Sequence, residues 1–216
     1  MFLGHFALAL GAKRVAPRAS LGALFLAAQW SDLLWPFLLL AGIERVTVAP
    51  GDTAATPLRF DAYPISHSLL MLALWALLGG LLYFHLGRDR RGALVVAVLV
   101  LSHWVLDVVT HRPDLPLTPW GHTRLGLGLW NAPRLAMAVE LLLFAAGVML
   151  YLRATRPLDR TGRYATWAML VFLVVVHIAN SLGPIPPSSQ AVGYTALALW
   201  LLPLWAWWAD RHRAPV

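Results

Sequence analysis

The chain has 216 residues, of which 59% are hydrophobic and only 12% are charged, and its formal net charge is +7. A soluble domain carries about 25% charged residues, so this composition argues against a soluble globule and favours a surface that faces lipid. The chain has no cysteine, which excludes disulfides and thiolate metal sites and leaves His, Asp, Glu or backbone oxygen to hold any metal ion.

Six long apolar segments follow one another, each close to the ~20 residues that cross about 30 Å of hydrocarbon. Residues 2–12 come before them and are apolar but too short to span, which predicts a half-inserted or interfacial helix. Pro36 in the first span predicts a kink. The predicted spans are 20–43, 64–86, 92–111, 133–152, 163–183 and 190–209. We therefore predict an all-α polytopic membrane bundle in which residues 1–216 form a single integral membrane domain.

The positive charges alternate between the two sides of this topology. Twelve of the 17 Lys and Arg residues lie in the turn at 13–18, the loops at 87–91 and 153–163, and the C-terminal tail. The other five are spread over the side that holds the longer loops, 44–63 and 112–132. The positive-inside rule then predicts that the basic turn and the C-terminus are cytoplasmic. Since topology accounts for the net charge, we predict no nucleic-acid partner.

Several predicted spans contain ionisable side chains, which are costly in hydrocarbon and usually have a functional reason. These residues are Asp32 in the first span, His67 at the start of the second, His103 and Asp107 in the third, and Glu140 in the fourth. All of them fall in the half of the bilayer nearer the long loops. An antiparallel hairpin of residues 2–12 with the first span would bring His5 there too. Random placement would scatter these groups, so their convergence predicts one site.

The third span ends in the pattern His103-x-x-x-Asp107-x-x-x-His111. Residues four apart share a helix face, so His103 and Asp107 can bind one metal ion, and His111 follows one turn later. The alternative for the first two is an ion pair that packs helices, but a carboxylate in hydrocarbon needs the stronger compensation that a cation gives. For His111 a ligand, a proton shuttle and a solvated helix end all remain open.

The other candidates have alternatives of their own. Asp32 is a ligand or a partner for an Arg or a Trp N–H, and we favour the ligand. His67 can instead belong to an interfacial helix cap with its neighbouring serines, and His5 can be a simple interfacial histidine. Glu140 has no neutralising neighbour in sequence, which favours a ligand or a general base. His177 is expected to form interhelical hydrogen bonds.

Several short stretches together resemble a known family: GHFALALGA near the start, an Asp in the first span, SHS, SHWVLDVVTH, and PDLPL followed by LGLGLWN. They are similar to the bacterial inner-membrane metal-dependent hydrolases, also described as LexA-binding, over about residues 1–135. That family is distantly similar to zinc-dependent phospholipase C and P1 nuclease. Many relatives carry a second Asp where this chain has Leu34, so the number of ions, one or two, stays open. The resemblance implies metal ligation by His5, Asp32, His67, His103 and Asp107, with His111 and Glu140 as catalytic candidates by analogy.

The leading hypothesis is a membrane-embedded, metal-dependent hydrolase. The mixed nitrogen and oxygen ligands favour Zn²⁺ or Mn²⁺, and the location favours a lipid or lipid-linked substrate, most simply a phosphoester. Glu140 or His111 would be the general base or acid. One alternative is a metal-ion or proton transporter that uses the same residues, although few polar residues continue into the cytoplasmic half. The other is a non-catalytic scaffold that binds a cytoplasmic regulatory protein, as the family description implies.

Overall fold

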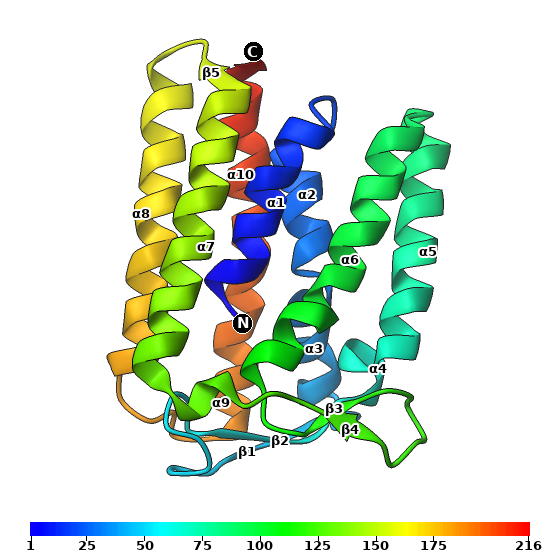
Figure 1. Ribbon diagram of the computed structural model, residues 1–216, viewed down its shortest axis with the longest axis vertical. Helices are drawn as coiled ribbons and strands as arrows, with labels where there is room; N and C mark the ends of the chain where they lie inside the picture. Colours follow the sequence, from blue (N-terminus) through cyan, green and yellow to red (C-terminus); the bar gives the residue numbers. More distant parts are fainter.

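The computed structural model describes residues 1–216, and its long helices lie side by side along its longest axis (Figure 1). Five segments are long and apolar enough to cross a membrane, and a sixth span forms if a bent pair of helices counts as one. The five are α5 (Leu69–Gly87), α6 (Arg90–Thr110), α7 (Pro133–Ala154), α8 (Arg160–Leu182) and the segment Ser189–Arg211, which contains α9 (Ser189–Ala196), η2 (Leu197–Trp200) and α10 (Leu201–Arg211). The prediction of an all-α polytopic membrane bundle is confirmed.

The first predicted span is bent, and the sharp bend lies elsewhere than predicted. α2 (Leu21–Ala28) and α3 (Trp30–Leu40) meet at Gln29 with an angle of 55°, whereas Pro36 lies inside α3 without ending it. The carbonyl oxygen of Ala28, the last residue of α2, accepts a hydrogen bond of 2.8 Å from His103 Nδ1. The bend therefore coincides with a contact between distant parts of the chain, which the proline rule does not include.

The predicted N-terminal helix is part of the bundle core. α1 (Leu3–Val15) packs against α7, α2 and α6, and its N-terminus lies within the bundle, in the lower half of the view in Figure 1. The side chains of Leu3, Phe6 and Leu10 are fully buried. A Cβ atom at Gly147 of α7 would lie 2.4 Å from the Ala7 carbonyl oxygen, so glycine is what permits this close approach. α1 thus delivers its side chains to the interior rather than to the interface.

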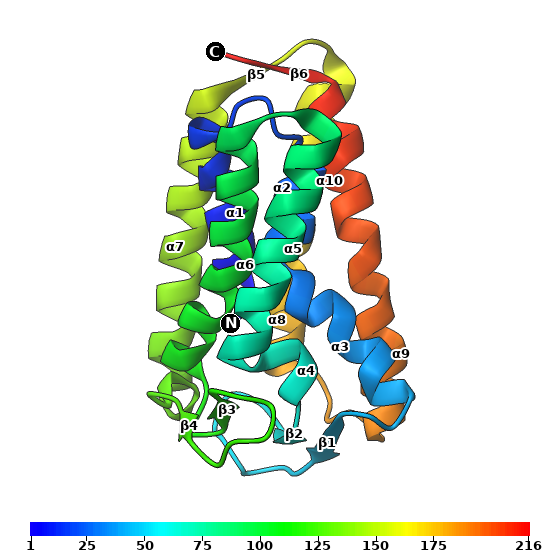
Figure 2. The same ribbon diagram turned by 90° about the vertical axis from the view of Figure 1, so that its right-hand side faces the viewer.

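The connections separate into two ends of the bundle (Figures 1 and 2). One end holds the short turns between α1 and α2, α5 and α6, and α7 and α8, together with the C-terminus. The strands there are β5 (Thr155–Pro157) and β6 (Arg213–Pro215). The other end holds α4 (Pro64–His67), the antiparallel pairs β1 (Arg45–Val48) with β2 (Leu58–Ala62) and β3 (Leu115–Pro116) with β4 (Arg124–Leu125), and η1 (Leu129–Asn131). The two long loops therefore share one end, which we call the hairpin end; the side of the membrane that it faces stays a prediction.

A buried ion pair lies at the opposite end. Lys13 Nζ lies 2.6 Å from Asp210 Oδ2 and donates to the Ala19 carbonyl oxygen at 2.8 Å. Asp210 also accepts from the Leu21 backbone N–H at 3.0 Å and from the Tyr151 hydroxyl at 3.1 Å. The network joins the turn after α1 to α7 and α10, and its charges neutralise each other inside the protein.

Candidate metal centre

The structure brings together all five residues that the sequence predicts as metal ligands. His5 comes from α1, Asp32 from α3, His67 from α4, and His103 and Asp107 from α6. They form two groups that share His103, one with His5 and Asp107 and one with Asp32 and His67, and within each group the ligand atoms lie within 4.8 Å of one another. Four of the five are at most 4% exposed, while the Asp32 side chain is 28% exposed. We call these five residues the His/Asp cluster.

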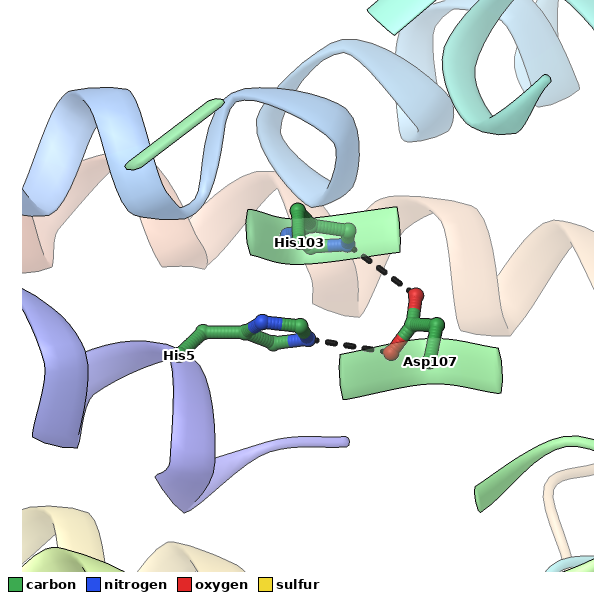
Figure 3. A group of neighbouring side chains, drawn as sticks. All are labelled: His5, His103 and Asp107. Atoms are coloured by element: carbon green, nitrogen blue, oxygen red, sulfur yellow. Dashed lines mark hydrogen bonds and ion pairs between the residues drawn. The ribbon is translucent and has the colours of Figure 1, made fainter. Parts of the chain in front are cut away.

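Asp107 lies at the centre of the His/Asp cluster. Its Oδ1 lies 3.1 Å from His5 Nε2 and its Oδ2 lies 3.2 Å from His103 Nε2 (Figure 3). On the other side, Asp32 Oδ1 lies 3.4 Å from His67 Nε2 and 3.7 Å from His103 Nε2. The rings of His5 and His103 stack with their centroids 3.7 Å apart. The imidazole Nε2 atoms and the carboxylates thus face one region between the helices.

Two of the histidines in the cluster are held by contacts at Nδ1. These contacts orient the rings so that Nε2 faces the carboxylates. His103 Nδ1 donates to the carbonyl of Ala28, which can only accept, and His67 Nδ1 lies 2.6 Å from Ser66 Oγ. Metal-binding histidines in proteins are usually held by such a bond from the other ring nitrogen. The backbone carbonyl therefore fixes the proton of the His103 ring on Nδ1 and leaves Nε2 as a ligand atom.

Two imidazole nitrogens of the cluster residues have no hydrogen-bond partner, and one of them, His103 Nε2, faces the carboxylates. His103 Nε2 is buried and makes no hydrogen bond although Asp107 is near, because the geometry between them does not suit one, and His5 Nδ1 is also buried without a partner. Buried polar atoms normally have a partner, so an orphaned imidazole nitrogen needs an explanation. Three imidazoles and two carboxylates are donors that Zn²⁺ and Mn²⁺ accept. The residues present therefore fit a divalent metal ion.

The N-terminus of α1 is fastened beside the cluster. The amine of Met1 donates to Asp107 Oδ1, so this oxygen is shared between the amine and His5. Glu140 Oε2 accepts the backbone N–H groups of Phe2 at 2.8 Å and Leu3 at 2.6 Å. Glu140 therefore positions the first turn of α1, on which His5 lies, and it stands outside both ligand groups. Its catalytic role stays a prediction.

His111 belongs to a second buried network, just beyond the end of α6. Its Nδ1 lies 3.0 Å from Asp114 Oδ1, which also accepts from the Tyr63 hydroxyl at 2.7 Å, and Arg112 Nε donates to Asp114 Oδ2. Burial lowers the pKa of His111. Burial alone would raise the pKa of Asp114, but the hydrogen bond and charge of His111, with the other donors, lower it. His111 is only 3% exposed, so the alternative of a solvated helix end is wrong.

Two buried carboxylates escaped the sequence reasoning. Asp114 lies three residues after His111, a spacing that could have indicated its contact. Glu44 follows α3, is fully buried, and bonds Ser66 just before His67. No local pattern connects Glu44 with His67, because the loop between them brings them together. Of the other candidates, His177 makes no interhelical hydrogen bond through Nε2, and its ring stacks on Phe2 instead.

In a comparison with known protein families, residues 1–183 match the family described as YdjM inner membrane protein. The chain belongs to this family. The match runs from α1 to the end of α8 and so includes every residue of the His/Asp cluster. No curated protein and no solved structure matches the chain. Together with its apolar helices, membership of the YdjM family makes this a multi-pass inner-membrane protein. The family description gives a location and no reaction.

Proposed function

We propose that this inner-membrane protein is a membrane-embedded, metal-dependent hydrolase that acts on a lipid or lipid-linked phosphoester. The observation that carries the proposal is the convergence of three imidazoles and two carboxylates from four helices on one buried region. Ionisable groups are costly in a membrane unless something compensates them. His103 also keeps its Nε2, which faces the carboxylates of the cluster, without a hydrogen-bond partner, and a bound cation would satisfy it.

The His/Asp cluster would hold one or two divalent ions, with Zn²⁺ or Mn²⁺ favoured by its donors. When bound, such an ion supplies Lewis-acid polarisation of a phosphoryl or acyl oxygen and makes water more acidic. The two ligand groups share His103, which supports a compact site rather than two separate ones. Asp107 would be the central ligand, since it lies near all three histidines.

His111 is the side chain best suited to proton transfer. It lies one helical turn after Asp107, and Asp114 bonds its Nδ1, so that Nε2 is left to take up or release a proton. Burial lowers the pKa of His111, which favours the neutral ring, and the neutral ring has a lone pair that can take up a proton. Glu140 would act mainly by holding α1, and its second oxygen remains a candidate acid or base.

Access to the cluster supports an amphiphilic substrate. Asp32 is the member with a partly exposed side chain, and it lies on α3, where Phe37 is 50% exposed. A phosphoester head group could reach Asp32 while its acyl chains stay against apolar helix surface. Trp120 in the loop after α6 is 76% exposed, as is typical of a residue at a membrane interface. We therefore infer entry from the half of the bilayer nearer the hairpin end.

The transporter alternative lacks comparable support. A transport pathway needs free polar groups through both halves of the membrane. In the half away from the cluster, Lys13 and Asp210 bind each other, and their remaining contacts are satisfied by Ala19, Leu21 and Tyr151. These polar groups are therefore paired with one another and are not free to line a path. A cytoplasmic regulatory partner is implied by the resemblance alone.

Purified protein reconstituted in liposomes tests the proposal. Release of a labelled phospholipid head group should require added Zn²⁺ or Mn²⁺, stop with a chelator, and fall to background in His103→Ala. His122→Ala is the matched control, because His122 is exposed in the outer loop and should keep full activity. Metal flux measured in the same liposomes without any hydrolysis would overturn the proposal in favour of transport.

A further inference from the structure

The fully buried carboxylate of Glu44 lies close to His67, one of the predicted ligands. Glu44 is 0% exposed and follows α3, the helix that carries Asp32. Its Oε1 accepts the backbone N–H groups of Ile65 at 2.8 Å and Ser66 at 2.9 Å, which cap the start of α4. Its Oε2 lies 2.6 Å from Ser66 Oγ. The cap needs only Oε1, so the bond from Oε2 to the hydroxyl calls for a separate reason.

The hydroxyl of Ser66 connects this carboxylate to the metal centre. Ser66 Oγ lies 2.6 Å from His67 Nδ1, and both Ser66 and His67 are buried. A hydroxyl has one proton, and a carboxylate can only accept. If Ser66 gives its proton to Glu44, its oxygen must accept from His67, so the ring proton lies on Nδ1. His67 Nε2, which faces Asp32 at 3.4 Å, then carries a lone pair.

We propose that Glu44 is a positioning residue that acts through Ser66 to fix the tautomer of His67, so that Nε2 is free to bind a metal ion. This inference rests on the proposed metal site and assigns to it a residue outside the His/Asp cluster. The His103 ring is fixed in the same way, because its Nδ1 donates to the Ala28 carbonyl, which takes the place of Ser66 Oγ. The two Nε2 lone pairs are thereby turned toward Asp32 and Asp107.

α3 links the two halves of this arrangement. Its first turn carries Asp32 near the cluster, and Glu44 lies four residues after its last residue. The backbone N–H of Glu44 donates to the Leu38 carbonyl of α3 at 3.1 Å. One helix therefore supplies a predicted ligand and holds the group that orients the facing histidine. Partners outside the ligand set typically change metal affinity by about 10–100-fold when they are lost.

Glu44→Gln is the decisive variant because it keeps the shape and reverses one hydrogen bond. Its amide oxygen can still accept the two backbone N–H groups and so keep the α4 cap. Its amide nitrogen would face Ser66 Oγ and donate to it, which turns the hydroxyl proton toward His67 Nδ1. The ring proton then moves to Nε2, where Asp32 can accept it, and Nε2 no longer binds a metal.

The experiment measures tautomer and metal affinity in the purified full-length protein. Nitrogen-15 NMR of metal-free protein should show His67 protonated on Nδ1 in the wild type and on Nε2 in Glu44→Gln. Titration with Co²⁺, followed by its visible spectrum, should give an affinity about 10–100-fold weaker in Glu44→Gln and in Ser66→Ala. Asp61→Asn is the matched control, since Asp61 bonds Thr47 and Arg59 on the hairpin and should leave both measurements unchanged.

The outcomes separate this inference from the proposed metal site. An unchanged tautomer in Glu44→Gln with wild-type Co²⁺ affinity overturns the role of Glu44 and leaves the metal site intact. A wild-type protein that binds no Co²⁺ overturns the metal site itself. A lower Co²⁺ affinity in Glu44→Gln without the change of the His67 tautomer also contradicts the inference, because it would show a general loss of structure.

Discussion

Replacing Glu140 by alanine should release the first turn of α1 and disturb the His/Asp cluster at a distance. The Glu140 carboxylate accepts two backbone N–H groups, from Phe2 and Leu3, at 2.8 and 2.6 Å. In Glu140→Ala both buried donors would lose their partner, and each such loss costs about 1–3 kcal/mol. The expected loss of stability is therefore about 2–6 kcal/mol. For a chain of this length each kcal/mol lowers the melting temperature by about 2–4 °C.

Glu140→Gln is the control that separates positioning from charge. Its amide oxygen can still accept both N–H groups, although neutral hydrogen bonds are weaker than charged ones, so about half the destabilisation of the alanine variant is expected. Thermal unfolding in detergent gives the stabilities, and hydrogen exchange at Phe2 and Leu3 reports whether α1 opens locally. Two results together would refute the anchoring role of Glu140. The wild type and both variants would melt within 2 °C of one another, a difference of about 1 kcal/mol or less, and hydrogen exchange at Phe2 and Leu3 would be equal in all three.

Three further changes probe other parts of the account. Lys13→Met leaves its buried carboxylate partner on α10 without a cation, and thermal unfolding should show a loss of about 3–5 kcal/mol; an unchanged melting temperature would contradict the role of this buried ion pair. Gly147→Ala places a Cβ atom against the backbone of α1 and should cost about 1–3 kcal/mol, whereas Gly87→Ala, which meets no neighbour within 4 Å, should not. The pKa of Asp114 is below its usual 3.8 in the folded protein, so its contribution to stability is present above about pH 4 and is lost as the pH falls further. The melting-temperature advantage of wild type over Asp114→Asn should shrink below that pH, and a constant difference would contradict the assignment.

The membrane bundle could be predicted from the sequence because hydrophobic length is a local property. The residues of the cluster could be predicted as well, since Asp32, His103 and Asp107 stand out against apolar spans where charge is rare. Their convergence followed from placing each one by depth along its own span. That reasoning needed no knowledge of which helix touches which.

The remainder depended on contacts between distant segments. The bend at Gln29 accompanies the bond between the Ala28 carbonyl and His103, so the proline rule pointed to the wrong residue. α1 is mostly buried in the core because Gly147 lets it approach α7, and its apolar composition alone could equally suit an interface. Glu44 had no sequence signal, because its contact with Ser66 forms only when the loop after α3 folds back.

Metal content of the purified protein tests the central claim most directly. Elemental analysis of wild type, loaded with Zn²⁺ or Mn²⁺ and then freed of excess ion, should find one or two ions per chain. The double variant with His103→Ala and Asp107→Ala should contain no bound metal ion. The control with His122→Ala and Asp61→Ala, which changes the same residue types outside the cluster, should match the wild type. Equal metal in all three proteins, or none in any of them, would contradict the account.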